Sequence, residues 1–169
     1  MKYSLYSKEI MKHFKNPKNV GKIKNPSGKG RVGNLACGDI MEFYIKVKKD
    51  KNGKERISDI KFQTFGCIVA LAVSSILTTM VKGKTLQQAI KINNNDILKK
   101  SGPVPPIKIH CSILAADALH EAIYDYLTKN KRIIPESLQK EHERIKNTLE
   151  QVERTHKEFT QFEEKILNK

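Results

Sequence analysis

The 169-residue sequence contains no tryptophan, only three cysteines, and few aromatic residues, which make up 7% of the chain. Three widely spaced cysteines cannot build the disulfide framework of a small secreted domain, so we expect free thiols in a reducing compartment. There is no run of about 18 or more apolar residues, which excludes an ordinary membrane span. The lysine-rich first residues predict no secretory signal, and a cytoplasmic protein is therefore expected.

Acidic residues are also scarce, 18 against 32 lysines and arginines, so the formal net charge is +14. Nearly all of this excess lies in residues 1–130. A positive field favours acidic partners, but the lysines are dispersed and no nucleic-acid-binding motif is present. We predict a solvated basic surface. The alternative is a basic nucleic-acid-binding module with a structural metal, whose affinity would fall steeply with salt and survive substitution of the cysteines.

Hydrophobic periodicity predicts a small antiparallel sheet. Apolar and polar residues alternate from Ile40 onward, and residues 57–65 repeat this pattern after an Asn-Gly turn within 51–54. A third strand is predicted at residues 31–35. Helical patterns and capping residues predict helices at residues 7–14, 68–82, 85–92 and 112–127.

A further helical turn is expected after a cap at Asn95 or Asp96, and the prolines of residues 103–106 are expected to exclude helix. The predicted architecture is α+β, a three-stranded antiparallel sheet covered on one face by helices, in a domain of residues 1–130.

Residues 131–169 are predicted to form a separate helical extension. Beyond Pro135, apolar residues recur every three or four positions, with His156 and Glu163 on the same stripe. Such a helix either folds back on the domain or pairs with another copy, giving a homo-oligomer. Four histidines are interpreted as surface residues: His13, His120, His142 and His156.

The three cysteines each lie at a junction between predicted elements. Cys37 precedes Gly38-Asp39, Cys67 follows Phe65-Gly66, and Cys111 follows His110. Helices are expected to begin just after Cys67 and Cys111, where the helix dipole would lower the pKa of both thiols.

Three thiolates with Asp39 or His110 would give zinc four ligands, or hold an iron–sulfur cluster with one non-thiolate position. The spacing is not diagnostic, because 29 and 43 residues separate successive cysteines. Buried structural cysteines therefore stay an open alternative. A Cys–His hydrolase is disfavoured, because adjacent side chains of His110 and Cys111 are expected to diverge at a helix start.

Several segments of the chain carry a family resemblance in the same order along the sequence. They are Tyr6-Ser7, His13-Phe14-Lys15-Asn16-Pro17-Lys18-Asn19-Val20-Gly21, Ala36-Cys37-Gly38-Asp39, Thr64-Phe65-Gly66-Cys67, residues 81–86 and residues 104–112. Through them, roughly residues 3–128 resemble the iron–sulfur cluster assembly scaffolds of the IscU/NifU-like family, which share the SufE/NifU-like fold.

The resemblance implies a scaffold rather than an enzyme. Such a protein accepts persulfide sulfur from a cysteine desulfurase, adds iron, builds a [2Fe–2S] cluster and transfers it to apo-proteins, with ferredoxin among its partners. The implied cluster ligands are Cys37, Cys67 and Cys111, and Cys111 or Cys37 would accept the persulfide. Asp39 and His110 match positions linked to the fourth site and to cluster release, and the isolated protein can also hold Zn²⁺.

The resemblance further implies binding of an Hsp70-type chaperone and a J-protein co-chaperone. The segment concerned is Val104, Pro105, Pro106, Ile107 and Lys108, with Val and Ile where the usual motif has Leu and Val. The alternative function is a zinc-bound sulfur acceptor (sulfurtransferase) of the same fold. That branch typically lacks a histidine beside the third cysteine, so His110 argues against it.

Overall fold

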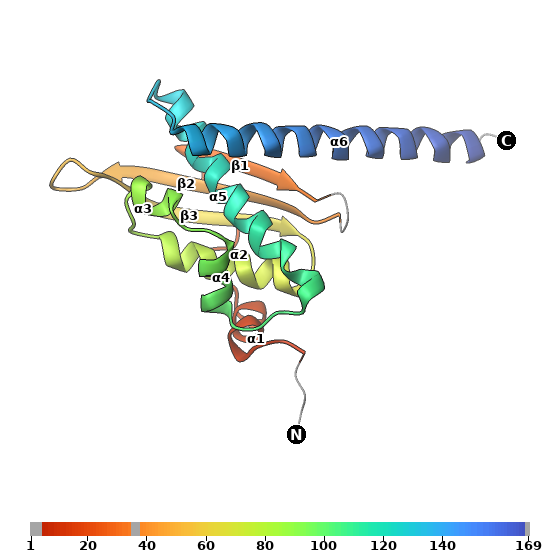
Figure 1. Ribbon diagram of the computed structural model, residues 1–169, viewed down its shortest axis with the longest axis horizontal. Helices are drawn as coiled ribbons and strands as arrows, with labels where there is room; N and C mark the ends of the chain where they lie inside the picture. Colours follow the sequence, from red (N-terminus) through yellow and green to blue (C-terminus); the bar gives the residue numbers. More distant parts are fainter. Residues whose placement is uncertain (1–4, 35–37, 168–169) are drawn as a thin grey trace.

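The computed structural model describes residues 5–34 and 38–167. One sheet is formed by three antiparallel strands in the order β1 (Gly28–Gly33), β2 (Ile40–Lys49) and β3 (Glu55–Phe65) (Figure 1). In the central strand, Phe43 pairs with Gly30 on one side and with Phe62 on the other. The predicted sheet is confirmed, although β1 begins and ends earlier than the expected third strand.

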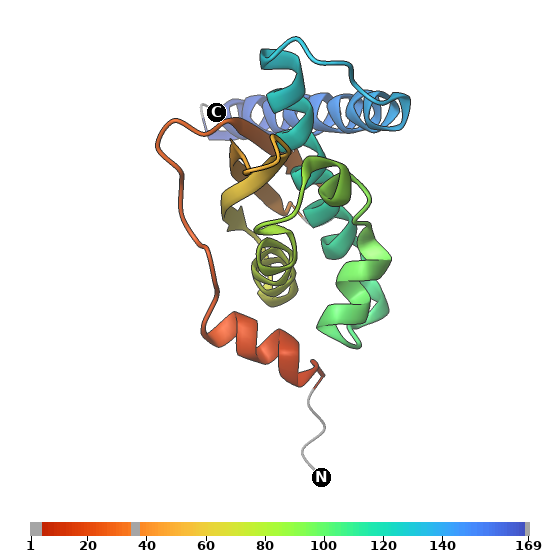
Figure 2. The ribbon, with the colours of Figure 1, turned by 90° about the vertical axis from the view of Figure 1, so that its left-hand side faces the viewer.

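Helices cover one face of this sheet (Figures 1 and 2). α2 packs on β3, while α5 crosses β1 and β2, and α1 packs against α2. The bounds are α1 (Lys8–Lys15), α2 (Ile68–Val81), α3 (Leu86–Ile90), α4 (Asn94–Ser101), the 3-10 turn η1 (Pro106–Lys108), α5 (His110–Lys129) and α6 (Glu136–Leu167). The expected α+β architecture is confirmed.

The core lies between the sheet and its helices. On β2, the alternating residues Met41, Phe43 and Ile45 are fully buried, as the period-two pattern predicts. The ring of Phe43 stacks on that of Phe62, with centroids 5.8 Å apart. Each such side chain contributes about 1.5–3 kcal/mol on burial, so this face of β2 fixes the register of the sheet.

Glycines allow α5 to lie directly on the backbone of β1. A Cβ atom added to Gly28 would lie 2.1 Å from the carbonyl oxygen of Ala122, and one added to Gly30 would lie 2.2 Å from that of Ala118. Any larger residue at either position would push the helix off the strand. This close approach holds α5 at a fixed height above the sheet.

Helix starts follow the expected capping chemistry, with two corrections. Ser7 caps α1, and Thr85 forms a capping box with Gln88 at α3. The cap of α4 is Asn93, two or three residues before the predicted cap at Asn95 or Asp96, because its side-chain oxygen accepts from the amides of both of those residues. The proline segment is helical at its end, since η1 begins at Pro106, where a missing N–H costs nothing.

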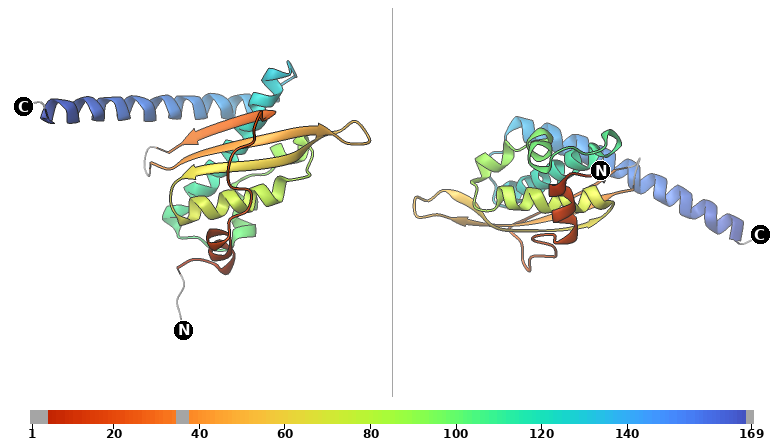
Figure 3. Two further views of the ribbon diagram at one scale, coloured as in Figure 1. Left: turned by 180° about the vertical axis from the view of Figure 1, so that it is seen from behind. Right: turned by 90° about the horizontal axis from the view of Figure 1, so that it is seen from below.

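The first part of α6 folds back on its own domain. Leu138 and Ile145 are buried in the common core, and α6 lies against α5 and β1. Further along, the helix projects past the end of the sheet (Figure 3). Of the two arrangements expected from the sequence, the structure therefore shows packing on the domain, and pairing with another copy stays a prediction.

Two of the histidines interpreted as surface residues are buried. His13 is 7% exposed and its Nδ1 lies 2.7 Å from the Ser75 hydroxyl, while His120 is 6% exposed and its Nδ1 lies 2.7 Å from Glu141. Burial lowers the pKa of His13, although Glu9 beside it acts in the opposite direction. The surface interpretation was wrong because these partners lie far away in the sequence.

A separate expectation concerned membranes. Within the part of the chain that the structure describes, no helix is both long and apolar enough to cross a bilayer.

Candidate metal centre

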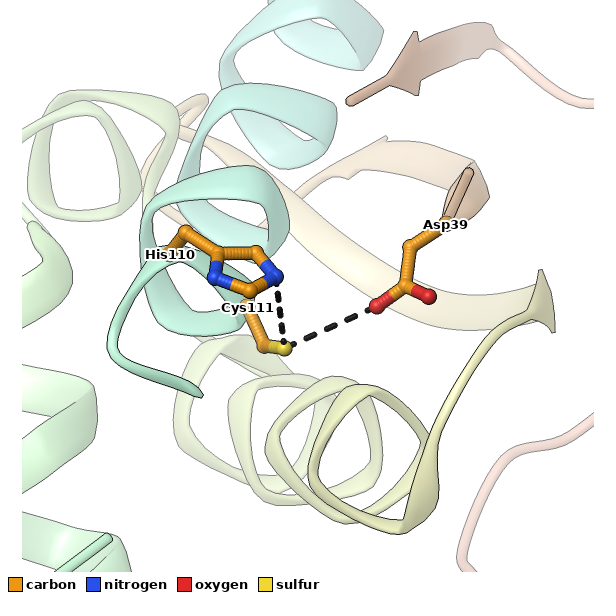
Figure 4. A group of neighbouring side chains, drawn as sticks. All are labelled: Asp39, His110 and Cys111. Atoms are coloured by element: carbon orange, nitrogen blue, oxygen red, sulfur yellow. Dashed lines mark hydrogen bonds between the residues drawn. The ribbon is translucent and has the colours of Figure 1, made fainter. Parts of the chain in front are cut away.

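The candidate site forms where three chain segments meet at one end of the sheet. Ile40 at the start of β2 pairs with Phe65 at the end of β3, which brings the preceding Asp39 beside the following Gly66 and Cys67. The first turn of α5 carries His110 and Cys111 to the same place (Figure 4). An antiparallel strand pair and one helix start therefore suffice to assemble the group.

The Cys111 thiol lies at the centre of the group. Its sulfur lies 3.5 Å from Nε2 of His110, 3.6 Å from Oδ2 of Asp39 and 3.7 Å from the sulfur of Cys67. The potential ligand atoms of Asp39, His110 and Cys111 all lie within 4.8 Å of one another. Two sulfurs bound at about 2.3 Å to one tetrahedral ion are about 3.8 Å apart, close to the observed sulfur–sulfur distance, so this spacing suits a metal.

Burial separates the residues of the site. Cys111 is fully buried and Asp39 is 5% exposed, whereas Cys67 and His110 are half-buried. Just outside, apolar side chains reach solvent, with Phe65 81% and Ile107 77% exposed. The inner ligands are thus shielded from water, while the outer pair faces an apolar rim.

The electrostatics of Cys111 contradict the prediction from its helix start. Burial raises the pKa of its thiol, and the nearby Cys67 and Asp39 raise it further. These effects outweigh the helix dipole, so Cys111 is a protonated thiol until a cation or a base stabilises the thiolate. A bound metal ion would supply that charge and release the proton.

The position of Asp39 depends on Gly66. A Cβ atom on Gly66 would lie 2.9 Å from Cγ and 3.1 Å from Oδ1 of Asp39. Next to it, the amide of Asn34 donates to the carbonyl of Asp39, and the amide of Gly38 donates to the carbonyl of Asn34. The sequence interpretation treated Gly66 only as part of a motif and missed this packing role.

The structure brings together four of the five residues predicted as ligands, namely Asp39, Cys67, His110 and Cys111. The fifth, Cys37, lies outside the described residues. The expected divergence of His110 and Cys111 was wrong, since their reactive atoms are 3.5 Å apart. A hydrolase is still not indicated, because Asp39 contacts the thiol and not the imidazole that it would have to orient.

The predicted chaperone segment lies just before the site. Pro106 and Ile107 are exposed, whereas Val104 is partly buried against the core. The segment therefore presents only its second half to a partner in this conformation.

Comparison with known proteins identifies the family. Residues 5–133, which include every predicted ligand, match the family model described as the NifU-like N terminal domain. The chain belongs to this NifU-like family. The iron–sulfur cluster assembly scaffold protein IscU 1 of Archaeoglobus fulgidus is 53% identical over 129 residues, which cover 76% of this chain and 81% of that protein.

Other relatives agree with this membership. The iron–sulfur cluster assembly scaffold protein IscU of Aquifex aeolicus is 46% identical over 143 residues, covering 82% of this chain and 89% of its own. The crystal structure of the N-terminal part of a NifU-like protein from Brucella abortus matches with a TM-score of 0.55 at 22% identity, covering 74% of this chain and 96% of that one. The last match shows the shared NifU-like fold. All of α6 lies beyond the family match, which ends at residue 133.

Proposed function

We propose that this member of the NifU-like family is a scaffold on which iron–sulfur clusters are assembled, and not a catalytic enzyme. The observation that carries the proposal is the convergence of Cys67 and Cys111 with Asp39 and His110 at one end of the fold. Relatives about half identical to this chain are named as such scaffolds.

The residues divide into two kinds of ligand. We assign Cys37, Cys67 and Cys111 as thiolate ligands, which retain iron strongly because soft sulfur donors suit iron–sulfur clusters. Asp39 or His110 completes the fourth position. A single oxygen or nitrogen ligand leaves one exchangeable corner, through which a [2Fe–2S] cluster passes to an apo-protein. Zinc is the ion that the same four-ligand group would hold when no iron is supplied.

Sulfur enters from a persulfide on a cysteine desulfurase. His110 can take the proton of the neighbouring Cys111 thiol, 3.5 Å away, and the resulting thiolate attacks the outer persulfide sulfur. The donor cysteine leaves as a thiolate while Cys111 carries the new S–S bond; Cys37 is the second candidate acceptor. Each transferred sulfur must gain two electrons, and a [2Fe–2S] cluster draws two of its four electrons from ferrous iron and two from a reductant such as ferredoxin.

Further partners follow from the same proposal. An Hsp70-type chaperone with its J-protein co-chaperone would bind residues 104–108, where Ile107 is 77% exposed. Apo iron–sulfur proteins receive the product. The cytoplasm supplies the reducing conditions that free thiols require, and we place the protein there.

The test is anaerobic reconstitution with ferrous iron, cysteine, a reductant and a cysteine desulfurase. We expect a visible chromophore with labile sulfide that transfers to an apo-ferredoxin, and its loss in Cys67→Ser and Cys111→Ser. A matched control is Ser58→Ala on β3. It removes a half-buried hydroxyl that donates a hydrogen bond to the carbonyl oxygen of Lys46, far from the thiols. Tight zinc, no chromophore and faster desulfurase turnover would instead indicate the sulfur acceptor.

A further inference from the structure

A small cavity separates the candidate site from α6. Its volume is about 130 Å³, and its wall comes from the end of β1, the first two turns of α5 and residues 144–148 in the first half of α6. The residues that matter here are Asn34, His110, Asp117, Arg144 and Thr148. His110 and Asp117 lie seven positions apart, so they share one face of α5. That face is turned toward α6.

One ion pair and two histidine–carboxylate contacts hold α6 on this face of α5. Arg144 on α6 donates to Asp117 on α5 at 2.7 Å. In one adjacent pair the histidine lies on α5, with His120 2.7 Å from Glu141. In the other the histidine lies on α6, with His142 3.0 Å from Glu121. The Asp117 side chain is nearly buried, whereas that of Arg144 is 54% exposed. Burial raises the pKa of Asp117 and Arg144 acts in the opposite direction, so Arg144 is the partner that offsets the cost of the buried carboxylate.

The helix also contacts the strand that leads into the site. Leu149 lies over Gly33, where an added Cβ would be 3.5 Å from Cδ1 of the leucine. α6 therefore spans from the end of β1 to the His110 side of α5. The family match ends at residue 133, so the α6 side of this wall lies outside the matched residues.

We propose that Arg144, paired with Asp117, is a positioning residue that holds α6 as an outer wall beside His110 and so slows release of the bound cluster. The proposal rests on the proposed function for its cluster measurement. Without the wall, the cavity opens to water beside His110, and the imidazole is free to leave its place next to Cys111. Ligand departure and entry of a competing ligand both become faster.

The main experiment is a double-mutant cycle on cluster release, measured as transfer to an apo-acceptor. We expect Arg144→Ala to accelerate release by about three- to tenfold, and Arg144→Lys to restore part of the difference. The charge swap Asp117→Arg with Arg144→Asp should restore slow release. Lys146→Ala is the matched control, since the ion pair of Lys146 among the described residues is with Glu150 on the same helix.

The decisive comparison uses His110→Ala. If Arg144 acts through His110, Arg144→Ala should add nothing in that background. Equal acceleration of cluster release in both backgrounds would overturn the proposal. It would also be overturned if Arg144→Ala releases the cluster at an unchanged rate while amide hydrogen exchange shows that α6 has left α5.

A second readout uses the metal-free full-length protein. Alkylation of Cys111, followed by mass spectrometry of its peptide, should speed up in Arg144→Ala and not in Lys146→Ala, because the fully buried thiol becomes accessible past His110. Unchanged alkylation would count against the wall. If alkylation responds while no variant assembles a cluster, the wall is supported and the proposed function fails.

Discussion

Replacing Gly66 by alanine tests how the structure places Asp39. The new Cβ would lie 2.9 Å from Cγ and 3.1 Å from Oδ1 of Asp39, and 3.0 Å from Cβ of Ala70. Contacts this short force a shift, and overpacking of this kind costs about 1–3 kcal/mol. Alanine also restricts the unfolded chain, which returns about 0.4–1 kcal/mol. We expect a net loss of about 1–2 kcal/mol in the free energy of unfolding.

The same substitution should cost less once Asp39 has been shortened. In an Asp39→Ala background, two of the three close contacts vanish, and only Ala70 remains near the new methyl group. We expect the cost of Gly66→Ala to fall below about 1 kcal/mol, so that the two sites couple by about 1 kcal/mol.

The assay is urea unfolding of the four metal-free proteins at one pH, with m-values compared to confirm two-state behaviour. An equal cost of Gly66→Ala in both backgrounds would refute the reasoning, because the methyl group would then not be meeting the carboxylate. A stabilised Gly66→Ala protein would refute it as well.

Three further predictions concern the packing, the pH dependence and the site. Gly30→Ala should destabilise the protein by more than about 3 kcal/mol or prevent folding, because α5 would have to move. Gly53→Ala, with nothing within 4 Å of the new methyl group, should cost only about 1–2 kcal/mol for its positive φ, and the urea midpoints of the two variants are compared. Burial lowers the pKa of His13 below its unfolded value of 6.5, so the stability that His13 contributes is present above that pH and is lost in acid. The fall in the urea midpoint from pH 7.5 to pH 5 should therefore be smaller in His13→Gln than in the unsubstituted protein, and an equal fall in both would contradict this. Asp39→Ala should lengthen the life of a reconstituted cluster several-fold, because it removes a competing oxygen ligand. The assay follows the loss of the visible absorbance of the cluster with a chelator present, and an unchanged rate of loss would mean that Asp39 does not promote cluster release.

Local patterns in the sequence were enough to predict the sheet and most helices. The alternation around Phe43, the Asn-Gly turn and the capping box at Thr85 all act over a few residues, and each appears in the structure. The ligand group could be predicted only by joining short segments around Asp39, Cys67 and His110 through a family resemblance. Spacing alone left it undecided, because more than 70 residues separate Asp39 from Cys111.

Several of the errors arose where distant groups meet. Nothing near His13 in the sequence indicates that Ser75 will accept or donate a hydrogen bond to it, and His120 looks exposed until Glu141 is placed opposite. The pKa of Cys111 depends on burial and on two neighbours from other segments, which outweigh a local helix dipole. Such effects follow from tertiary packing and not from periodicity.

The contact between β1 and α5 also sets the order in which the chain can mature on the ribosome. The amide of Lys29 donates to Asp125, 96 positions later, and α5 reaches its place only by settling on Gly30. Until residues near 129 have emerged, Cys67 has been synthesised but has neither Cys111 nor a closed core beside it. Non-local pairing of this kind is slow to form. The nascent chain therefore carries an unprotected thiol from the synthesis of residue 67 until residues near 129 have emerged, and metal capture or oxidation during that interval competes directly with folding.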